Sequence, residues 1–377
     1  MPLAPTALLA GRHERLRRAC AAQTLDALLV TTPSNIRYLT NHAGSAGVLL
    51  ATATEMHLLA DGRYTESVRA RQATEEACPG LVLHEVPASY EAATLDLLLA
   101  SGLRAVGFEA GNVTVARHAW WLKSLVARAA ALQLTPTEGL VEALRVVKDA
   151  FEIDVLRRSA RGLTAVAQAV MGGMRAGMTE RAVAGLIEAE LRANGYERPS
   201  FDPIVASGPN AALPHYRAGD RLLADGDMVV LDFGGVLDGY CSDLTRTVSV
   251  GEPSDEFRRV YGAVLDAQQA AIHAVRPGAS SAVVDKAARD VLSENGLGAA
   301  FSHGTGHGLG LDIHEDPRLT REQSHPPTPL LAGMVATVEP GAYLPGWGGV
   351  RIEDDVLVTA EGYELLTHVP RHLIMVG

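Results

Sequence analysis

The chain has 377 residues, of which 47% are hydrophobic, and it carries a formal net charge of −11 at pH 7. This length allows two domains with a substantial buried core, and the acidic balance argues against a nucleic-acid or acidic-membrane partner. Three widely spaced cysteines fit a reducing compartment better than a disulfide framework. No apolar run approaches the length of a membrane span. We therefore expect a cytoplasmic protein that binds neither nucleic acid nor membrane.

Helix and strand patterns alternate through the first part of the chain. Amphipathic helices are expected over residues 13–26, 63–73 and 89–102. Strands are expected over residues 27–32, 81–86 and 104–110, with two more within 46–61. Pro33 ends the first strand, and "QLTPTEG" (133–139) punctuates the chain with a proline and a glycine. This rhythm predicts an α/β domain over residues 1–137.

A long helix-compatible run over residues 140–174 opens the second domain, which we place at 138–377. A second helix is expected over 179–195, and the chain then turns strand-rich, with helical segments near 254–275 and 280–295. The predicted fold class is α/β (α+β) for the whole chain.

Two segments of the second domain echo one another. "DGDMVVLDFGG" (225–235) and "LAGMVATVEPGA" (332–342) each place a turn, an apolar strand, an acid and a glycine in the same order. Each leads to a second strand with a further acid, over residues 239–250 and 348–359. The echo predicts two half-domains related by a pseudo-two-fold axis through a shared site; the alternative is a chance match between strand-rich segments.

Four acids lie within the apolar strands of these two hairpins: Asp232, Asp243, Glu339 and Glu353. If each segment turns a hairpin, the two acids of a pair approach one another across adjacent strands, where like charges destabilise the sheet. An isolated buried carboxylate is very costly, so these acids must be paired, protonated or metal-bound. The structural alternative is a salt bridge to Arg246 or Arg351.

The stretch "HGTGHGLGLDIHE" (303–315) adds three histidines. His303 and His307 are four residues apart, but the glycines between them argue against a helix, and Gly304 replaces the Glu that a zincin motif needs. Four carboxylates balance two divalent cations, and oxygen ligands with one imidazole suit Mn, Co or Zn. We assign His307 as the nitrogen ligand. His303 and His314 then remain beside the metals for substrate.

At these residues the chain resembles the Xaa-Pro peptidases, prolidase and aminopeptidase P. The resemblance rests on "DFGGVLDGYCSDLTRT", "HGTGHGLGLDIHE", "TVEPGAY" and "GVRIEDD", and it extends through "ASGPNAALPHY" (206–216). The N-terminal "LDALLVTTPSNIRYLTNHAGSAGVLL" and "LLADGRY" resemble the creatinase-type domain of that family. The resemblance implies a creatinase-type N-terminal domain followed by a pita-bread metallopeptidase domain.

The resemblance also implies a role for each site residue. Asp232 would bind one metal, His307 and Glu339 the other, and Asp243 and Glu353 would bridge the two. A water activated between the metals would attack the scissile carbonyl. Further matches concern proton transfer and substrate: Glu339 for proton transfer, His215 for stabilising the intermediate, His303 and His314 for substrate contact, and Arg351 for ordering the site.

Arg318, four residues after His314, matches the arginine that binds the carboxylate of a C-terminal proline in prolidases of this kind. A planar guanidinium suits that ligand; the alternative is a solvated loop arginine. We predict an Xaa-Pro dipeptidase that acts on proline-containing dipeptides or short peptides and, as the family suggests, forms a homodimer. The alternatives are an aminopeptidase P, which cleaves before proline in longer peptides, and a non-catalytic peptide-binding module.

Overall fold

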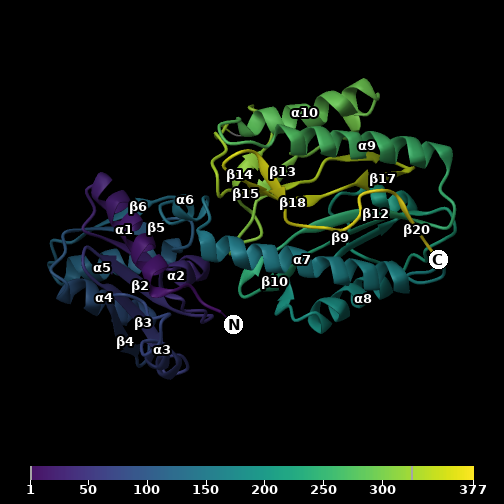
Figure 1. Cartoon of the computed structure of the whole chain (residues 1–377). Helices are drawn as coiled ribbons and strands as arrows, with labels where there is room; N and C mark the ends of the chain where they lie inside the picture. Colours follow the sequence, from purple (N-terminus) through teal and green to yellow (C-terminus); the bar gives the residue numbers. More distant parts are fainter. Residues whose placement is uncertain (1, 324–325) are drawn as a thin grey trace. The chain divides into compact units, whose positions relative to one another are not determined.

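The structure is a computed structural model that describes residues 2–323 and 326–377. The chain folds into two compact units, Met1–Arg145 and Val146–Gly377 (Figure 1). Each unit combines helices with β-sheet. The domain boundary expected between residues 137 and 138 falls just after the last strand of the first unit and stays a prediction.

The first unit is built on a mixed six-stranded sheet. Its strands are β1 Ala27–Val30, β2 Val48–Thr52, β3 Met56–Asp61, β4 Leu81–Val86, β5 Ala105–Glu109 and β6 Gln133–Thr137, in the spatial order β4-β3-β2-β1-β5-β6. The pairs β1–β2 and β2–β3 are antiparallel, and the other pairs are parallel. The helices are α1 Thr6–Ala22, α2 Pro33–Thr40, α3 Thr65–Arg71, α4 Tyr90–Ala100, α5 Val115–Ala127 and α6 Glu142–Arg145.

Two proline positions in this unit differ from the sequence interpretation. Residues 133–137 form a strand, where the sequence predicted punctuation, and Pro136 pairs with Phe108. A proline is tolerated there because β6 lies at the edge of the sheet. Pro33 does follow the first strand, but it is the first residue of α2, a position where the missing N–H costs nothing.

The long helical run predicted from residue 140 to 174 is interrupted. Helix α6 ends at Arg145, and α7 (Ala150–Gly173) begins after four intervening residues. Asp149 caps α7 through a reciprocal capping box with Glu152, which fixes the start of that helix. The backbone N–H of Lys148 donates to Gly333 O at 2.9 Å, and Val147 forms an isolated bridge with Met334, so the intervening residues pair with the segment just before β15 instead of continuing the helix.

The described residues of the second unit form four long helices: α7, α8 Glu180–Ala193, α9 Asp255–Ala274 and α10 Ser281–Glu294. Its strands and 3-10 turns are β7 Arg198–Pro199, β8 Ile204–Ser207, η1 Gly208–Ala212, β9 Met228–Phe233, β10 Gly235–Leu237, β11 Tyr240–Cys241, β12 Leu244–Val250, η2 Gly298–Ala300, β13 Gly306–Gly308, β14 Glu315–Leu319, β15 Val335–Val338, β16 Gly341–Leu344, β17 Gly348–Arg351, β18 Asp354–Val358, β19 Tyr363–Leu365 and β20 Ile374–Val376.

The order of these elements repeats. The first half runs through two helices into β8, β9 and β12, whose sheet is completed by β20 from the end of the chain. The second half runs through two helices into the sheet β14-β13-β15-β18-β19. Each half places one antiparallel strand pair at its centre, β9 with β12 and β15 with β18. This repetition is the one expected from the echo between the two hairpin segments.

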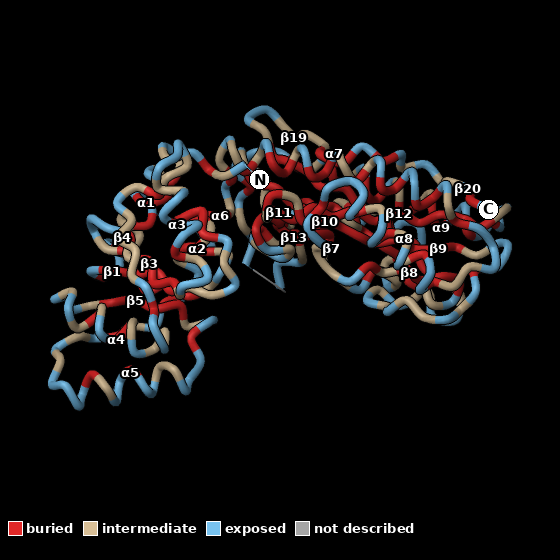
Figure 2. The backbone as a smooth tube through the Cα atoms, turned by 90° about the horizontal axis from the view of Figure 1, so that it is seen from below, coloured by how far each residue is buried: buried red, intermediate tan, exposed pale blue. Residues whose placement is uncertain are grey.

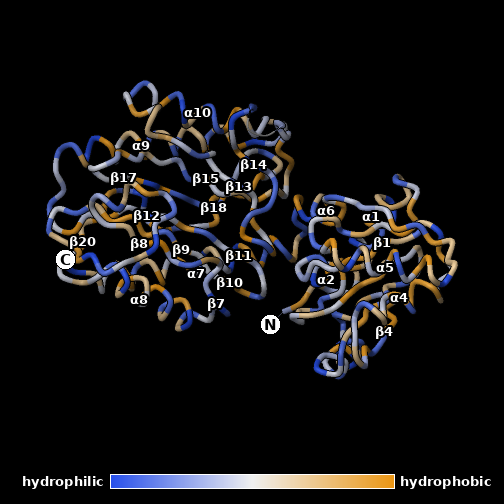
Figure 3. Tube along the Cα trace, turned by 180° about the vertical axis from the view of Figure 1, so that it is seen from behind, coloured by the Kyte–Doolittle hydropathy of each residue, from blue (hydrophilic) through white to orange (hydrophobic). Residues whose placement is uncertain are grey.

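The central strands of the second unit are buried, as the red trace of β9, β12 and β13 in Figure 2 shows. Hydropathy alternates along α9 and α10, in keeping with helices that bury one face (Figure 3). Within the described part of the chain, no helix has both the length and the apolar character needed to cross a bilayer.

Candidate metal centre

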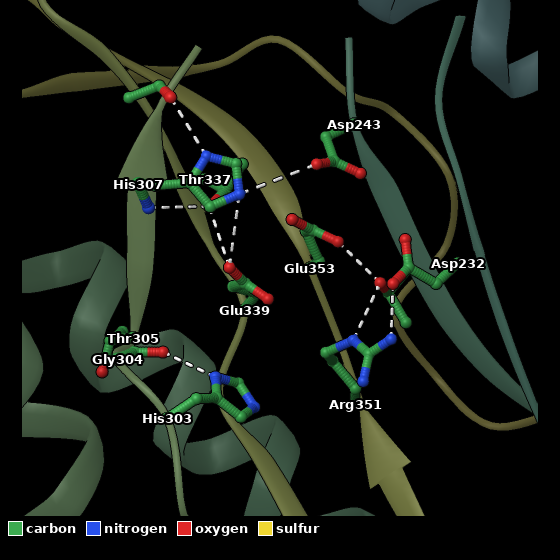
Figure 4. Close-up of polar contacts among 12 residues, drawn as sticks. Asp232, Asp243, His303, Gly304, Thr305, His307, Thr337, Glu339, Arg351 and Glu353 are labelled. Carbon is green, nitrogen blue, oxygen red and sulfur yellow. Dashed lines mark hydrogen bonds and ion pairs between the residues drawn. The ribbon is translucent and has the colours of Figure 1, made fainter. Parts of the chain in front are cut away.

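The second unit brings the four acids and the histidine of the sequence prediction into one region (Figure 4). Asp232 lies on β9 and Asp243 directly precedes β12. Glu339 directly follows β15 and Glu353 directly precedes β18. The side chains of Asp243, Glu339 and Glu353 point toward the ring of His307, which lies on β13.

The two acid pairs do not have the same register. On β9 and β12, Asp232 is opposite Thr245, so Asp243 is its diagonal neighbour and does not face it directly. The short hairpin of β10 and β11 lies between them in the chain. On β15 and β18, the last ladder pair is Val338 with Asp354, and Glu339 and Glu353 lie just beyond it, where their backbone N–H groups donate to Thr305 O and Thr245 O. In neither hairpin, therefore, does the strand pairing place the two acids directly opposite each other, which differs from the expectation.

His307 lies on a strand with glycines on both sides, in agreement with the prediction that this stretch is not helical. A Cβ on Gly306 would lie 1.9 Å from Thr337 O, and one on Gly308 would lie 2.1 Å from Asp316 O. Both positions exclude a side chain because neighbouring backbone approaches so closely. The glycines thereby allow β13 to lie between β14 and β15 with the imidazole beside the acids.

The ring orientation of His307 leaves one nitrogen free for a cation. Nδ1 lies 3.0 Å from Gly308 O, and since a carbonyl only accepts, Nδ1 carries the proton. The lone pair of Nε2 then faces Glu339 Oε1 at 3.5 Å and Asp243 Oδ2 at 3.9 Å. Acceptors that converge in this way repel one another unless a cation lies among them.

The carboxylates beside His307 also lie close together, with no positive charge from a described residue among them. One ligand atom each from Asp243, His307 and Glu353 lies within 4.8 Å of the other two. Glu353 is 1% exposed, and its Oε1 has no hydrogen-bond partner among the described residues. A buried unpartnered carboxylate oxygen is costly, so the donor set fits a divalent metal.

The pKa values follow from burial and crowding. In the chain alone, burial and then the charge of Asp232 raise the pKa of Asp243 well above its usual value. Burial, followed by repulsion from Asp243, does the same to the pKa of Glu353. Burial lowers the pKa of His307 to about 3, so its imidazole stays neutral and able to bind a metal.

Arginines neutralise only part of this charge. Arg351 donates through Nη2 to Asp232 Oδ2 and through Nη1 to the hydroxyl of Tyr343 at 2.7 Å. Arg246 pairs with Asp354 at 2.8 Å instead of with one of the four acids. The salt-bridge alternative thus applies to Asp232 alone: within the described residues, the other three acids form no ion pair with arginine or lysine.

A cavity of about 860 Å³ opens beside this cluster. The residues proposed from the sequence as ligands or substrate contacts all line it: His215, Asp232, Asp243, His303, His307, His314, Arg318, Glu339, Arg351 and Glu353. The His314 ring packs against His307, with centroids 4.4 Å apart. Arg318 is opposite His307 in the β13–β14 register, and its side chain makes no hydrogen bond or ion pair with any described residue.

Both ring nitrogens of His303 have a hydrogen-bond partner within the protein. Its Nδ1 lies 2.7 Å from Gly304 O and its Nε2 lies 2.8 Å from the hydroxyl of Tyr343. Tyr343 thus joins His303 to Arg351, a connection that the sequence interpretation missed although "TVEPGAY" ends on this tyrosine. Asp355, the last residue of "GVRIEDD", was also missed: its Oδ2 accepts from the backbone N–H of Asp243 at 3.1 Å.

Known proteins share both parts of the chain. Residues 154–360 match metallopeptidase family M24, and residues 12–147 match the creatinase/prolidase N-terminal domain. The Bacillus subtilis protein called "Uncharacterized peptidase YqhT" is 38% identical over 362 residues, which cover 96% of this chain and 99% of that protein. The order of the two matches confirms the predicted order of domains.

Three solved structures are similar over nearly the whole chain. An Xaa-Pro dipeptidase from Bacillus anthracis has a TM-score of 0.90 and 37% identity, covering 98% of this chain and 100% of that one. A prolidase from Pyrococcus horikoshii OT3 has a TM-score of 0.86 and 30% identity, and the match covers 97% of this chain and 100% of that one. An X-Pro aminopeptidase from Thermotoga maritima MSB8 has a TM-score of 0.84 and 33% identity, and the match covers 97% of this chain and 99% of that one. With its converging acids, its histidine and these likenesses, the chain belongs to metallopeptidase family M24.

Proposed function

We propose that the protein is an Xaa-Pro dipeptidase that cleaves the bond before a C-terminal proline. The observation that carries this choice is Arg318, a half-buried guanidinium in the cavity wall with no anionic partner among the described residues. A dipeptide's proline presents a free carboxylate at that side of the scissile bond. Arginine binds carboxylates in a planar, two-pronged geometry, so Arg318 suits a substrate that ends at proline.

The metal ligands in this proposal are Asp232, Asp243, His307, Glu339 and Glu353. Two divalent ions, with Mn, Co and Zn as candidates, would lower the pKa of a bound water and so supply a nucleophile at neutral pH. The N–H of His307 Nδ1 donates to Gly308 O and thereby fixes the tautomer that presents Nε2. Arg351 and Thr245 hold the carboxylates of Asp232 and Glu353 in place.

The remaining residues act on the peptide. Glu339 would take the proton from the attacking water at its carboxylate and pass it to the proline nitrogen as the C–N bond breaks. His215 and His314 line the same cavity and would donate to the carbonyl oxygen as negative charge develops there. The Xaa-Pro bond has no N–H, so a pocket that selects it requires no acceptor at that position.

The test compares Ala-Pro with Ala-Pro-Ala as substrates for the full chain reconstituted with Mn, Co or Zn. We expect rapid release of proline from Ala-Pro and little cleavage of the tripeptide. Rapid tripeptide cleavage would favour an aminopeptidase P, the second candidate, which the similarity to the Thermotoga maritima X-Pro aminopeptidase supports. Cleavage of neither peptide by metal-loaded protein would contradict both and favour the non-catalytic module. We also propose a homodimer and a cytoplasmic location.

A further inference from the structure

One buried side chain, that of Glu180, accepts hydrogen bonds from several residues of the loop that carries His215. Residues 207–219 run from Ser207, the last residue of β8, toward β9, and they contain the short 3-10 turn η1. Pro214, His215 and Tyr216 in this loop line the cavity. Glu180, the first residue of α8, contacts the loop at both of its ends and in between, and its own exposure is 0%.

Five donors converge on the Glu180 carboxylate. Oε1 accepts from Ser207 N at 2.8 Å, from Ser207 Oγ at 2.7 Å and from Asn210 Nδ2 at 3.0 Å. Oε2 accepts from the hydroxyl of Tyr216 at 2.9 Å and from Gly219 N at 3.2 Å. Asn210 Nδ2 also donates to the Tyr216 hydroxyl at 2.9 Å, which joins two of the donors to each other. Tyr216 is the residue next to His215, so the histidine lies inside the segment that this carboxylate fixes.

The chemistry of the cluster requires an ionised acid. Burial alone would raise the pKa of Glu180, but hydrogen bonds, above all from Asn210 and Ser207, outweigh it and hold the pKa below its usual value. A carboxylate in the first turn of α8 is also favoured by the helix dipole. Glutamine at this position would turn one accepting oxygen into an NH2 group that faces donors, and the loop would have to rearrange.

We propose that Glu180 is a positioning residue that places His215 for the reaction by holding the loop 207–219 against α8. The inference rests on the proposed peptidase function, in which His215 stabilises charge that develops on the substrate carbonyl. It assigns to Glu180 no contact with substrate or metal. Its effect on catalysis therefore passes through His215.

The test is a double-mutant cycle on Ala-Pro hydrolysis by the metal-loaded full chain. Glu180→Gln should lower kcat roughly 10- to 100-fold, the range expected when a catalytic group is displaced by about an ångström. KM should change less than about twofold, because the lost interaction is made in the transition state. In Glu180→Gln/His215→Ala, kcat should equal that of His215→Ala alone. A double variant whose loss is the product of the two single losses overturns the proposal, and so does an unchanged kcat in Glu180→Gln.

The matched control is Glu190→Gln, the same change on the same helix, where the side chain makes no hydrogen bond with the described residues; we expect wild-type kinetics. If Glu180→Gln does not fold, Tyr216→Phe, which removes one of the five donors, takes the place of Glu180→Gln in the double-mutant cycle. We expect a smaller decrease in kcat, and this decrease must again disappear in the His215→Ala background.

Hydrogen–deuterium exchange tests the inference without activity. Amides of residues 207–219 should exchange faster in Glu180→Gln than in the wild type, while amides of α9 and α10 should not change. Unchanged loop exchange would overturn the proposal even if activity fell. If the wild type cleaves no Xaa-Pro peptide, the proposed function fails, whereas faster loop exchange in Glu180→Gln would still show that this carboxylate holds the His215 loop.

Discussion

Thr245 Oγ1 donates to Glu353 Oε2 at 2.6 Å and so links the two halves of the second unit across the candidate metal centre. Thr245 is also opposite Asp232 in the β9–β12 register, and its hydroxyl accepts from Arg351 Nε at 3.2 Å. One hydroxyl therefore supports a carboxylate of the second hairpin and the arginine that pairs with an acid of the first.

Thr245→Val removes this hydroxyl without changing the shape of the side chain. Because groups that orient metal ligands strongly affect affinity, we expect Mn affinity to fall roughly 10- to 100-fold. Isothermal titration of metal-free protein measures the change. Ser249→Ala on the same strand is the control, since Ser249 Oγ has no partner among the described residues, and its affinity should match the wild type. Equal affinities for all three proteins would contradict the supporting role of Thr245.

Metal removal should lower the melting temperature. Ions that bind only the folded state stabilise it by about 2.7 kcal/mol when the free ion concentration is about a hundred times Kd. This corresponds to a shift of roughly 5–10 °C in melting temperature for a unit of this size. Scanning calorimetry with and without Mn measures the shift. Asp243→Asn should show a clearly smaller response, because Asp243 faces His307 Nε2 in the cluster. A full-sized shift in that variant would remove Asp243 from the ligand set.

Arg318→Ala tests the choice of substrate. A charge-assisted hydrogen bond contributes on the order of 1.5–3 kcal/mol, so kcat/KM for Ala-Pro should fall roughly 10- to 150-fold. Cleavage of Ala-Pro-Ala, which has no carboxylate at that position, should barely change. Arg321→Ala, at an exposed position in the same segment, is the control and should behave as the wild type. Equal losses on both peptides would remove the reason for preferring a dipeptidase.

His13 should make the first unit sensitive to acid. Burial lowers its pKa to about 4, and its Nε2 lies 2.6 Å from Leu39 O. Between pH 6.5 and about 4 the unfolded chain binds a proton that the folded chain does not. The contribution of neutral His13 to the free energy of unfolding is therefore complete above pH 6.5. It is lost as the pH falls from 6.5 to about 4, by on the order of 3 kcal/mol.

Urea unfolding of the full chain at pH 7.5 and pH 4.5 measures this loss. His13→Gln keeps an N–H donor for Leu39 O but does not titrate, so its free energy of unfolding should fall less than that of the wild type over the same interval. Parallel losses in the two proteins would mean that other groups cause the acid sensitivity.

The candidate centre was predictable because its chemistry conflicts with its surroundings. Asp232 interrupts an apolar strand, Glu353 lies between two strands, and a buried acid at either position requires a partner. The glycines around His307 likewise indicated that this stretch is not helical. The register was not predictable: whether Asp243 faces Asp232 depends on the residues used by the β10–β11 hairpin, and a shift of this kind leaves the alternating pattern of the strand unchanged.

Elements fixed by distant contacts were also missed. The break before α7 depends on Lys148 pairing with Gly333, which is far away in the sequence, and helix propensity alone favours continuation. In the sequence, Glu180 looks like an ordinary acid in the first turn of a helix, because the donors that bind its carboxylate come from residues 207–219, which are distant in the sequence. Tyr343 reads as a strand tyrosine until Arg351 and His303 meet at its hydroxyl.

The proposed ligands are divided between the two repeats: Asp232 and Asp243 come from the first, while His307, Glu339 and Glu353 come from the second. A folding intermediate with only one repeat formed would hold an incomplete set and bind metal weakly. Tight metal binding would therefore require both repeats to be folded and in contact, and would serve as a probe of their association. Because neither repeat alone holds the full set, a variant that unfolds either repeat would lose the metal site as a whole.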